Sequence, residues 1–246
     1  MKRMKMIVLF LAIISFSGFT LTVYSSDKKS KQMQELFDEI KRNQDALSIW
    51  TLARHPYTPK EVLIELSRDN QEWSTARRGV ATNPNTPRDI LEFFIKDTDS
   101  AVRFGVADNP STPRSILEKL AYDQDSTVRC IIAENSRVSK KFFYYLSKDT
   151  NSFVRMCLAS NANVPKEILR KLSVDGYDTV RVQVGENSNT SRDILVKMSR
   201  DNSFSVRLSV ARNPNTPKET LSLLMNLEGE YELMRKAILE NPTFHK

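Results

Sequence analysis

Three segments of the chain are nearly identical: VATNPNTPRDIL at residues 80–91, VADNPSTPRSIL at 106–117 and VARNPNTPKETL at 210–221. Looser copies are IAENSRVSKKFF, LASNANVPKEIL and VGENSNTSRDIL, from residues 132, 158 and 184, and LARHPYTPKEVL, from residue 52. From residue 80 onward the copies are 26 residues apart. Tandem spacing of this size is typical of a protein in which short units stack on their neighbours. One Asn recurs in every copy of this series, as Asn83, Asn109, Asn135, Asn161, Asn187 and Asn213.

Each copy predicts a turn between two helices. Thr86 is expected to be the N-cap of a helix that begins at Pro87, with Asp89 completing a capping box. Apolar residues at helical spacing extend this first helix to about ten residues. A second, briefer helix, such as 100–108, then leads to the next Asn. Because neither helix is long enough to be stable alone, the core must form between neighbouring repeats.

The repeats divide the chain into three parts. Residues 46–246 hold seven to eight tandem repeats of about 26 residues, which leaves no room for a second domain. Residues 26–45 are expected to be a linker and an N-terminal capping helix, because Met33, Leu36, Phe37 and Ile40 share one helical side. Residues 1–25 have the charged, apolar and small-residue layout of a signal peptide.

Residues 1–25 leave more than one interpretation open. Cleavage as a signal peptide is the favoured one. The alternatives are an uncleaved membrane anchor over residues 6–24, which is just long enough to span a bilayer, and a buried helix. Signal peptide and anchor both place the remaining chain outside the cytoplasm, as a periplasmic, secreted or membrane-anchored protein.

Composition excludes several classes of function. The 246 residues carry a formal charge of +7, of which Lys2, Arg3 and Lys5 contribute three. The remaining excess does not by itself indicate nucleic-acid binding. Two Cys and two His exclude a disulfide framework and a multi-cysteine metal site. Because no catalytic triad, metal-ligand spacing or Gly-rich phosphate loop is visible, we expect a protein that is not an enzyme and has no cofactor.

The copy VRFGVADNPSTPRSILEKLAYD, at 102–123, resembles the leucine-rich repeat variant, a bacterial family of helical repeats, and the similarity covers about 200 residues. The resemblance implies an all-α fold: a right-handed α-solenoid of two-helix repeats, an α-helix plus a short or 3₁₀ helix. HEAT-type repeats are the next nearest resemblance. A founding member of the family carries a cysteine-ligated iron–sulfur module, but this chain has no such cluster of Cys, so no redox role follows.

Two polar residues recur in the repeats as a structural ladder. The first is the Asn of the turn, whose amide can bond free backbone groups at a helix end. The second is an Arg six residues before each Asn. It is expected to pair with the Asp that ends the preceding helix, as in Arg103 with Asp97, although a row of arginines that grips an anion is the alternative. These arginines are Arg77, Arg103, Arg129, Arg155, Arg181 and Arg207.

Cys130 and Cys157 lie 27 residues apart, in neighbouring repeats. A disulfide is conceivable in an oxidising compartment. However, stacked helices are typically 8–10 Å apart, which is long for bonded cysteines. Two unbonded core cysteines are therefore the favoured interpretation.

Two sets of exposed residues are candidates for binding. Phe93, Tyr144 and Tyr145 fall outside the apolar stripe, so they are either scattered surface aromatics or an anchor patch for a protein. A basic residue also follows the Pro position of every repeat, although the positive end of a helix disfavours a cation there. Either its stem covers apolar surface while its head pairs with a nearby acid, or the side chains form a binding row. The row consists of Lys60, Arg88, Arg114, Lys140, Lys166, Arg192 and Lys218.

The sequence favours an exported, non-enzymatic repeat scaffold that binds a protein, and we expect a monomer. Stacked repeats offer an extended surface whose outer positions vary while the core stays constant. The alternative is binding of an anionic polymer, a lipid surface or nucleic acid through the basic row, with nucleic acid disfavoured by export.

Overall fold

A computed structural model describes residues 26–43, 46–68, 74–226 and 231–245. All regular structure in these residues is α-helical, which confirms the all-α fold class. The expected signal peptide or anchor lies outside the described residues. None of the described helices is long and apolar enough to cross a bilayer. The chain separates into two blocks, Met1–Leu120 and Ala121–Lys246.

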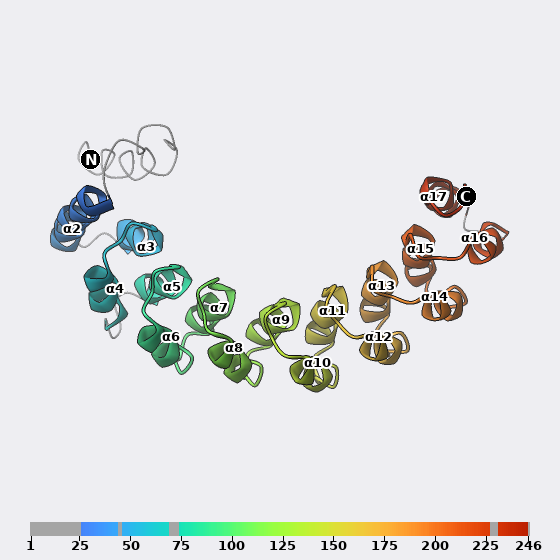
Figure 1. The fold of residues 1–246 in the computed structure, drawn as a ribbon, viewed down its shortest axis with the longest axis horizontal. Coiled ribbons are helices and arrows are strands. Elements are labelled where there is room, and N and C mark those ends of the chain that lie inside the picture. Colours follow the sequence, from blue (N-terminus) through green and yellow to red (C-terminus); the bar gives the residue numbers. More distant parts are fainter. Residues whose placement is uncertain (1–25, 44–45, 69–73, 227–230, 246) are drawn as a thin grey trace. The chain divides into compact units, whose positions relative to one another are not determined.

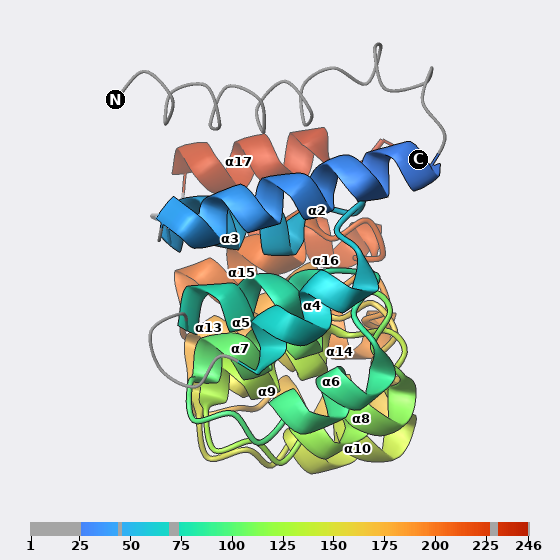
Figure 2. The same ribbon diagram turned by 90° about the vertical axis from the view of Figure 1, so that its left-hand side faces the viewer.

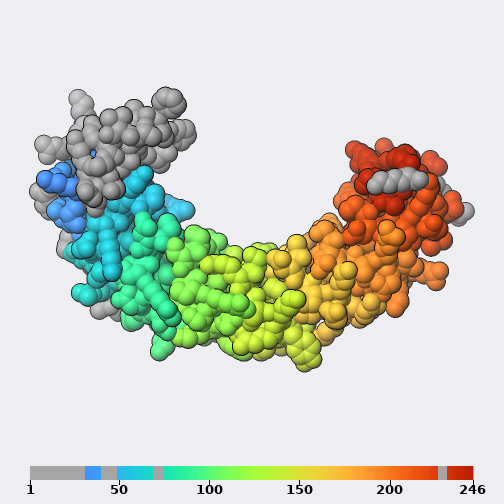
Figure 3. Space-filling view, in the orientation of Figure 1, coloured from blue at the N-terminus to red at the C-terminus, as the bar shows by residue number. Residues whose placement is uncertain are grey.

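Each repeat supplies one helix to each of two rows, and consecutive odd-numbered helices within a block pack against one another (Figure 1). In the N-terminal block, the odd row is α3 (Ala46–Arg54), α5 (Ser74–Thr82) and α7 (Ser100–Asp108), and the even row is α4 (Lys60–Ser67), α6 (Arg88–Phe94) and α8 (Arg114–Leu120). In the C-terminal block, the odd row is α9 (Ser126–Glu134), α11 (Ser152–Ser160), α13 (Asp178–Glu186), α15 (Phe204–Arg212) and α17 (Tyr231–Glu240). Its even row is α10 (Lys140–Leu146), α12 (Lys166–Leu172), α14 (Arg192–Met198) and α16 (Lys218–Met225). In the space-filling view, successive repeats follow one another along each block (Figure 3).

The two helices of a repeat differ in length from the sequence expectation. The helix after the turn, such as α6, has seven residues rather than about ten, and the following helix, such as α7, is the longer one with nine. The even-row helices are short because Pro87 is still extended and because the chain leaves the helix at Ile95. There the amide of Lys96 bonds the carbonyl of Phe93, three residues back.

The core lies between the rows and between neighbouring repeats. Helix α6 buries Ile90, Leu91 and Phe94, while α7 buries Val102 and Val106. The odd helices approach closely because small residues face each other. A Cβ added to Gly105 would lie 2.9 Å from the Cβ of Ala81 on α5, a separation that real Cβ atoms do not show.

The N-terminal helix α2 (Ser26–Asn43) packs beside α3 (Figure 2). Its residues Met33, Leu36 and Phe37 are buried, each at most 7% exposed. The side chain of Ile40, expected on the same stripe, is outside the described side chains. An amphipathic helix thus covers the first helix of the odd row.

The threonines of the turn do not cap the helix that follows them, contrary to the sequence prediction. Thr86 Oγ1 donates to the carbonyl of Val80 at the end of α5, 2.5 Å away, and no side chain caps α6. The Thr86 amide already bonds the carbonyl of Asn83, so a capping box with Asp89 has no amide to satisfy. Side-chain caps occur instead on the odd helices, where Asp99 accepts from the amide of Ala101.

Candidate functional site

The Asn ladder links each turn to the turn of the preceding repeat. Asn187 Nδ2 donates to the carbonyl of Ala159, at 2.7 Å, and to that of Asn161, at 3.0 Å, while its Oδ1 accepts from the Asn189 amide. Its side chain is buried, so these carbonyls have no access to water. Equivalent donor bonds to the preceding repeat are made by Asn83, Asn109, Asn161, Asn213 and Asn241. Asn135 accepts from the amide of Arg137 within its own turn.

The arginines pair with a different Asp from the one that the sequence predicted. Arg155 binds the carboxylate of Asp175 in the next repeat through Nε and Nη2, at 2.6 and 2.9 Å. Its Nη1 donates to the backbone carbonyl of Asp149, six residues before it. The expected pair of Arg103 with Asp97 is likewise a bond to the Asp97 carbonyl, and the Asp97 carboxylate is held by Arg77.

This two-sided bonding recurs along the stack. The carboxylate pairs are Arg77 with Asp97, Arg129 with Asp149, Arg155 with Asp175 and Arg181 with Asp201. Bonds to the carbonyl six residues back are made by Arg103, Arg129, Arg155, Arg181 and Arg207. In these four carboxylate pairs, no side chain is more than 16% exposed. Their guanidinium groups are therefore engaged in joining repeats, which leaves them poorly placed to grip a ligand.

The carboxylates of Asp149, Asp175 and Asp201 stay ionised to lower pH than usual. Burial by itself raises the pKa of Asp175, but the hydrogen bonds from Arg155 and from the Tyr177 amide, together with the charges of Arg155 and Arg181, outweigh it and lower the pKa. The pKa values of Asp149 and Asp201 are lowered by the same balance of causes. Both partners of these three pairs are thus charged at neutral pH.

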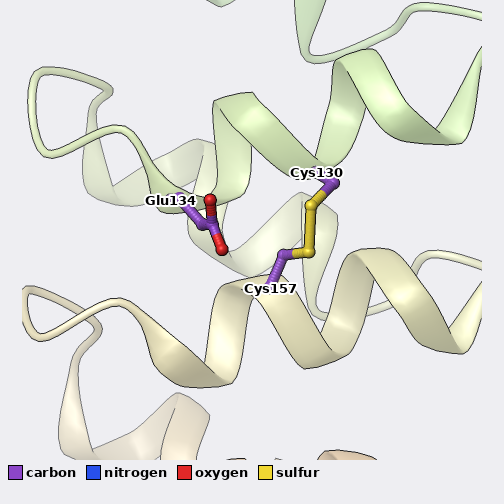
Figure 4. Close-up of side chains that lie close together, drawn as sticks. All are labelled: Cys130, Glu134 and Cys157. Atoms are coloured by element: carbon purple, nitrogen blue, oxygen red, sulfur yellow. A yellow bond between two sulfur atoms is a disulfide. The ribbon is translucent and has the colours of Figure 1, made fainter.

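Cys130 and Cys157 form a disulfide between α9 and α11, which corrects the expectation of two unbonded cysteines (Figure 4). Their Cα atoms are 5.4 Å apart. The sequence estimate used the distance between helix axes, but each Cα lies about 2.3 Å from its own axis. Residues that face each other therefore come several ångströms closer than the axes do. Glu134 lies beside the pair, but the bonded sulfurs are not available as metal ligands.

The basic row occupies the first residue of every even-row helix in both blocks. All seven side chains are exposed: Lys60, Arg88, Arg114, Lys140, Lys166, Arg192 and Lys218. Arg114 pairs with Glu118 on its own helix at 3.0 Å. For the other six, no ion pair with another residue of the described ranges occurs. The acids proposed as their partners, such as Asp89 and Glu167, are not within ion-pair distance of them.

The aromatic candidates fall in different blocks. Phe93, on α6, is 67% exposed and borders a groove of about 490 Å³ between α4 and α6, lined also by Ile64, Arg68 and Ile90. Tyr144 and Tyr145, on α10, are 56% and 45% exposed. Phe93 is therefore described with the N-terminal block, and the two tyrosines are described with the C-terminal block.

Sequence reasoning missed Tyr122, which joins the tyrosines of α10. Its ring centroid is 4.6 Å from that of Tyr145 and 5.8 Å from that of Phe142. Tyr122 directly precedes Asp123, the Asp that follows the even-row helix α8. In other repeats the residue before this Asp is Lys96, Lys148 or Arg200. An aromatic residue in a place that is basic in several other repeats, although Val174 holds it in one, was the signal that could have found it.

Comparisons with known proteins agree with this architecture. No protein-family model and no curated protein matches the chain. Among solved structures, the chain is similar to a leucine-rich repeat variant described as having a novel repetitive structural motif. The two are 26% identical, the match covers 88% of this chain and 86% of that one, and the TM-score is 0.63. An engineered protein matches at 16% identity over 84% of this chain and 77% of its own, with a TM-score of 0.40, too low to carry an argument.

The stacked two-helix repeats and their shared polar ladders define an α-solenoid. Within that class, the resemblance noted in the sequence is confirmed: the chain is similar, over most of its length, to the solved leucine-rich repeat variant.

Proposed function

We propose that this protein is an exported, non-enzymatic scaffold that binds a protein partner through the exposed faces of its repeats. The observation that carries the proposal is that one set of residues joins the repeats while a different, exposed set varies between them. The Arg, Asp and Asn side chains of the described ladders bond to neighbouring repeats, whereas the exposed positions of the even-row helices differ from repeat to repeat. Those positions include large aromatic residues, which are favoured at the centres of protein interfaces.

Export is supported by the disulfide. Bonded cysteines persist in oxidising compartments and are rare in the cytosol of mesophiles. The amino-terminal segment, with its basic start and apolar run, agrees with the same location. Trapping free thiols with an alkylating reagent directly in cells tests this part. Cys130 and Cys157 should escape alkylation unless the protein is first reduced, and alkylation in untreated cells would contradict export.

The binding role is tested by photocrosslinking in the native envelope. A photoreactive amino acid placed at exposed even-row positions should yield a discrete protein adduct, identified by mass spectrometry. The same amino acid at exposed position 202 of an interhelical turn serves as the control. Equal, diffuse labelling from all positions would contradict a specific protein partner.

Binding of an anionic polymer is the second candidate, and the basic row favours it. Six of its seven cations make no ion pair with the described residues, although their place at a helix start costs stability. Replacing Arg88, Arg114, Lys140 and Lys166 together by Gln tests it. Loss of salt-sensitive retention on a polyanion column, with unchanged stability, supports the row. Retained binding, or lost stability, assigns these residues a structural role.

A further inference from the structure

A cluster of tyrosines and lysines lies along the even row of the C-terminal block, on α10 and the turn that follows it, on α12, and in the turn before α9. We call it the tyrosine–lysine platform and define it as Tyr122, Tyr144, Tyr145, Lys148 and Lys171. Its three tyrosines are between 45% and 61% exposed. Helices α10 and α12 are neighbours in one row, and Tyr122 belongs to the repeat before that of α10, so the platform spans three consecutive repeats (Figure 1).

Contacts among the platform side chains hold the rings in place. Tyr122 lies against Tyr145, with ring centroids 4.6 Å apart, and meets the edge of Phe142, whose ring is buried in the core. Lys148 lies 4.2 Å from the centroid of the Tyr144 ring. Rings fixed in this way lose little conformational freedom when a partner binds.

Two lysine ammonium groups lie near the ring of Tyr144. Besides Lys148, the Nζ of Lys171 lies 5.8 Å from the ring centroid, and it is itself positioned by Ser147, whose carbonyl and hydroxyl it approaches at 3.4 and 3.3 Å. The hydrogen bond with Lys148, followed by the charges of Lys148 and Lys171, lowers the pKa of Tyr144. The ring thus lies in a positive local field.

The surroundings of the platform are basic. Residues 140–148 contain three lysines and no acid, while α12 has three basic residues against Glu167. Nearby carboxylates are neutralised by partners of their own: Asp149 is bound by Arg129, and Asp193 by Arg170. Charge complementarity therefore calls for an acidic occupant.

We propose that the tyrosine–lysine platform binds an acidic segment of a protein partner, with an apolar or aromatic side chain of that segment on Tyr122 and Tyr145 and its carboxylates on Lys148 and Lys171. This inference rests on the proposed protein-binding function. The rings favour a polypeptide over a simple polyanion, because a polyanion would need only cations. Exposed cations without aromatic neighbours, such as those of α14, would bind a polyanion equally well.

The repeats supply matched controls. Lys197 and Arg200 occupy the places of Lys171 and Lys148 in other repeats, and Phe93 occupies the place of Tyr145. All three side chains are exposed. The platform variants are therefore Y144A/Y145A and K148Q/K171Q, and the control variants are F93A and K197Q/R200Q.

The test uses a random dodecapeptide library displayed on phage, selected against the purified mature chain. Enriched peptides should be rich in Asp and Glu and should contain an aromatic or large apolar residue. Synthetic copies of the enriched peptides, titrated by calorimetry, should bind at least about tenfold more weakly to each platform variant and unchanged to each control. Higher salt should weaken binding.

Several results would overturn the inference. Peptides without an acidic excess, or affinities that fall equally in the control variants, would remove the platform as the site. Polyphosphate binding that depends on Lys148 and Lys171 but not on the tyrosines would assign the surface to an anionic polymer. If the platform variants still crosslink to a discrete protein in the envelope, the platform proposal fails while the binding function stands. If the parent chain yields no such adduct at all, the function itself fails.

Discussion

The turn of the repeat and the exposed face of the even-row helices obey opposite rules. The turn and the odd-row helix before it are nearly the same each time: the Asn of the turn bonds the preceding repeat, and the Arg of the helix bonds the next one. The exposed face differs, because the place held by Tyr144 on α10 is held by Glu92, Glu118, Arg170 and Val196 on other helices. What recurs therefore builds the stack, and what varies is free to recognise a partner. The basic row is the exception, since it recurs and is nevertheless exposed.

The largest effect is expected from the turn. Asn187→Ala removes two donor bonds to buried carbonyls and one acceptor bond, so the free energy of unfolding should fall by about 4 kcal/mol. Urea unfolding followed by circular dichroism measures this change. The exposed Asn202→Ala should change the free energy by less than about 0.5 kcal/mol. Equal effects at both positions would mean that the ladder does not hold the turns together.

The disulfide should rank next. Replacing Cys130 and Cys157 together by Ser opens a covalent loop with a sequence separation of 27 residues, and this change should cost about 3 kcal/mol of unfolding free energy. Adding reductant to the parent protein should have the same effect, while the double variant should be insensitive to it. If reductant does not change the stability of the parent protein, the disulfide does not stabilise the contact between α9 and α11.

A smaller effect separates buried from exposed ion pairs. Asp175→Asn weakens the partner of Arg155, whose side chain is only 13% exposed, and should cost about 2 kcal/mol. Asp193→Asn breaks an exposed pair with Arg170, where both side chains are about half exposed, and should cost less than about 1 kcal/mol. Thermal or urea unfolding of the two variants measures the difference. The reverse order would show that the Arg ladder is a surface feature.

The last prediction concerns how the unfolding free energy depends on pH, and its effect at neutral pH is the smallest. Because the folded-state pKa values of Asp149, Asp175 and Asp201 lie below their ordinary values, their contribution is fully present above the ordinary pKa. It is lost as the pH falls through the lower, folded-state pKa. Unfolding free energy should therefore be flat near neutrality and decline below about pH 4. The gap between the parent and Asp175→Asn should close there, and a gap that persists at pH 2 would contradict the assignment.

Much of the fold can be predicted from the sequence because the same residue pattern occurs in several copies. The 26-residue spacing of Asn83, Asn109 and the later asparagines aligns every helix boundary to within a few residues. The exact helix lengths do not follow. Whether Pro87 or the residue after it begins the helix depends on backbone angles that the sequence leaves open.

The same periodicity hides which groups pair. Asp97 is six residues before Arg103 and 20 after Arg77, and these separations add up to one repeat. Sequence spacing therefore fits either partner equally well, and only the direction of each side chain decides. The platform was hidden for a related reason, since Tyr122 and Tyr145 meet across two repeats, at positions that are not equivalent.

The most direct test of the contrast between recurring and varying residues measures two properties on two variants. Y144A/Y145A should keep its unfolding free energy within about 1 kcal/mol of the parent and lose about tenfold or more in affinity for the selected acidic peptides. Asp175→Asn should lose stability and, under conditions in which it remains folded, keep the affinity. If the tyrosine variant loses stability in proportion to its binding, or keeps its affinity, then the varying exposed face does not act as the binding surface.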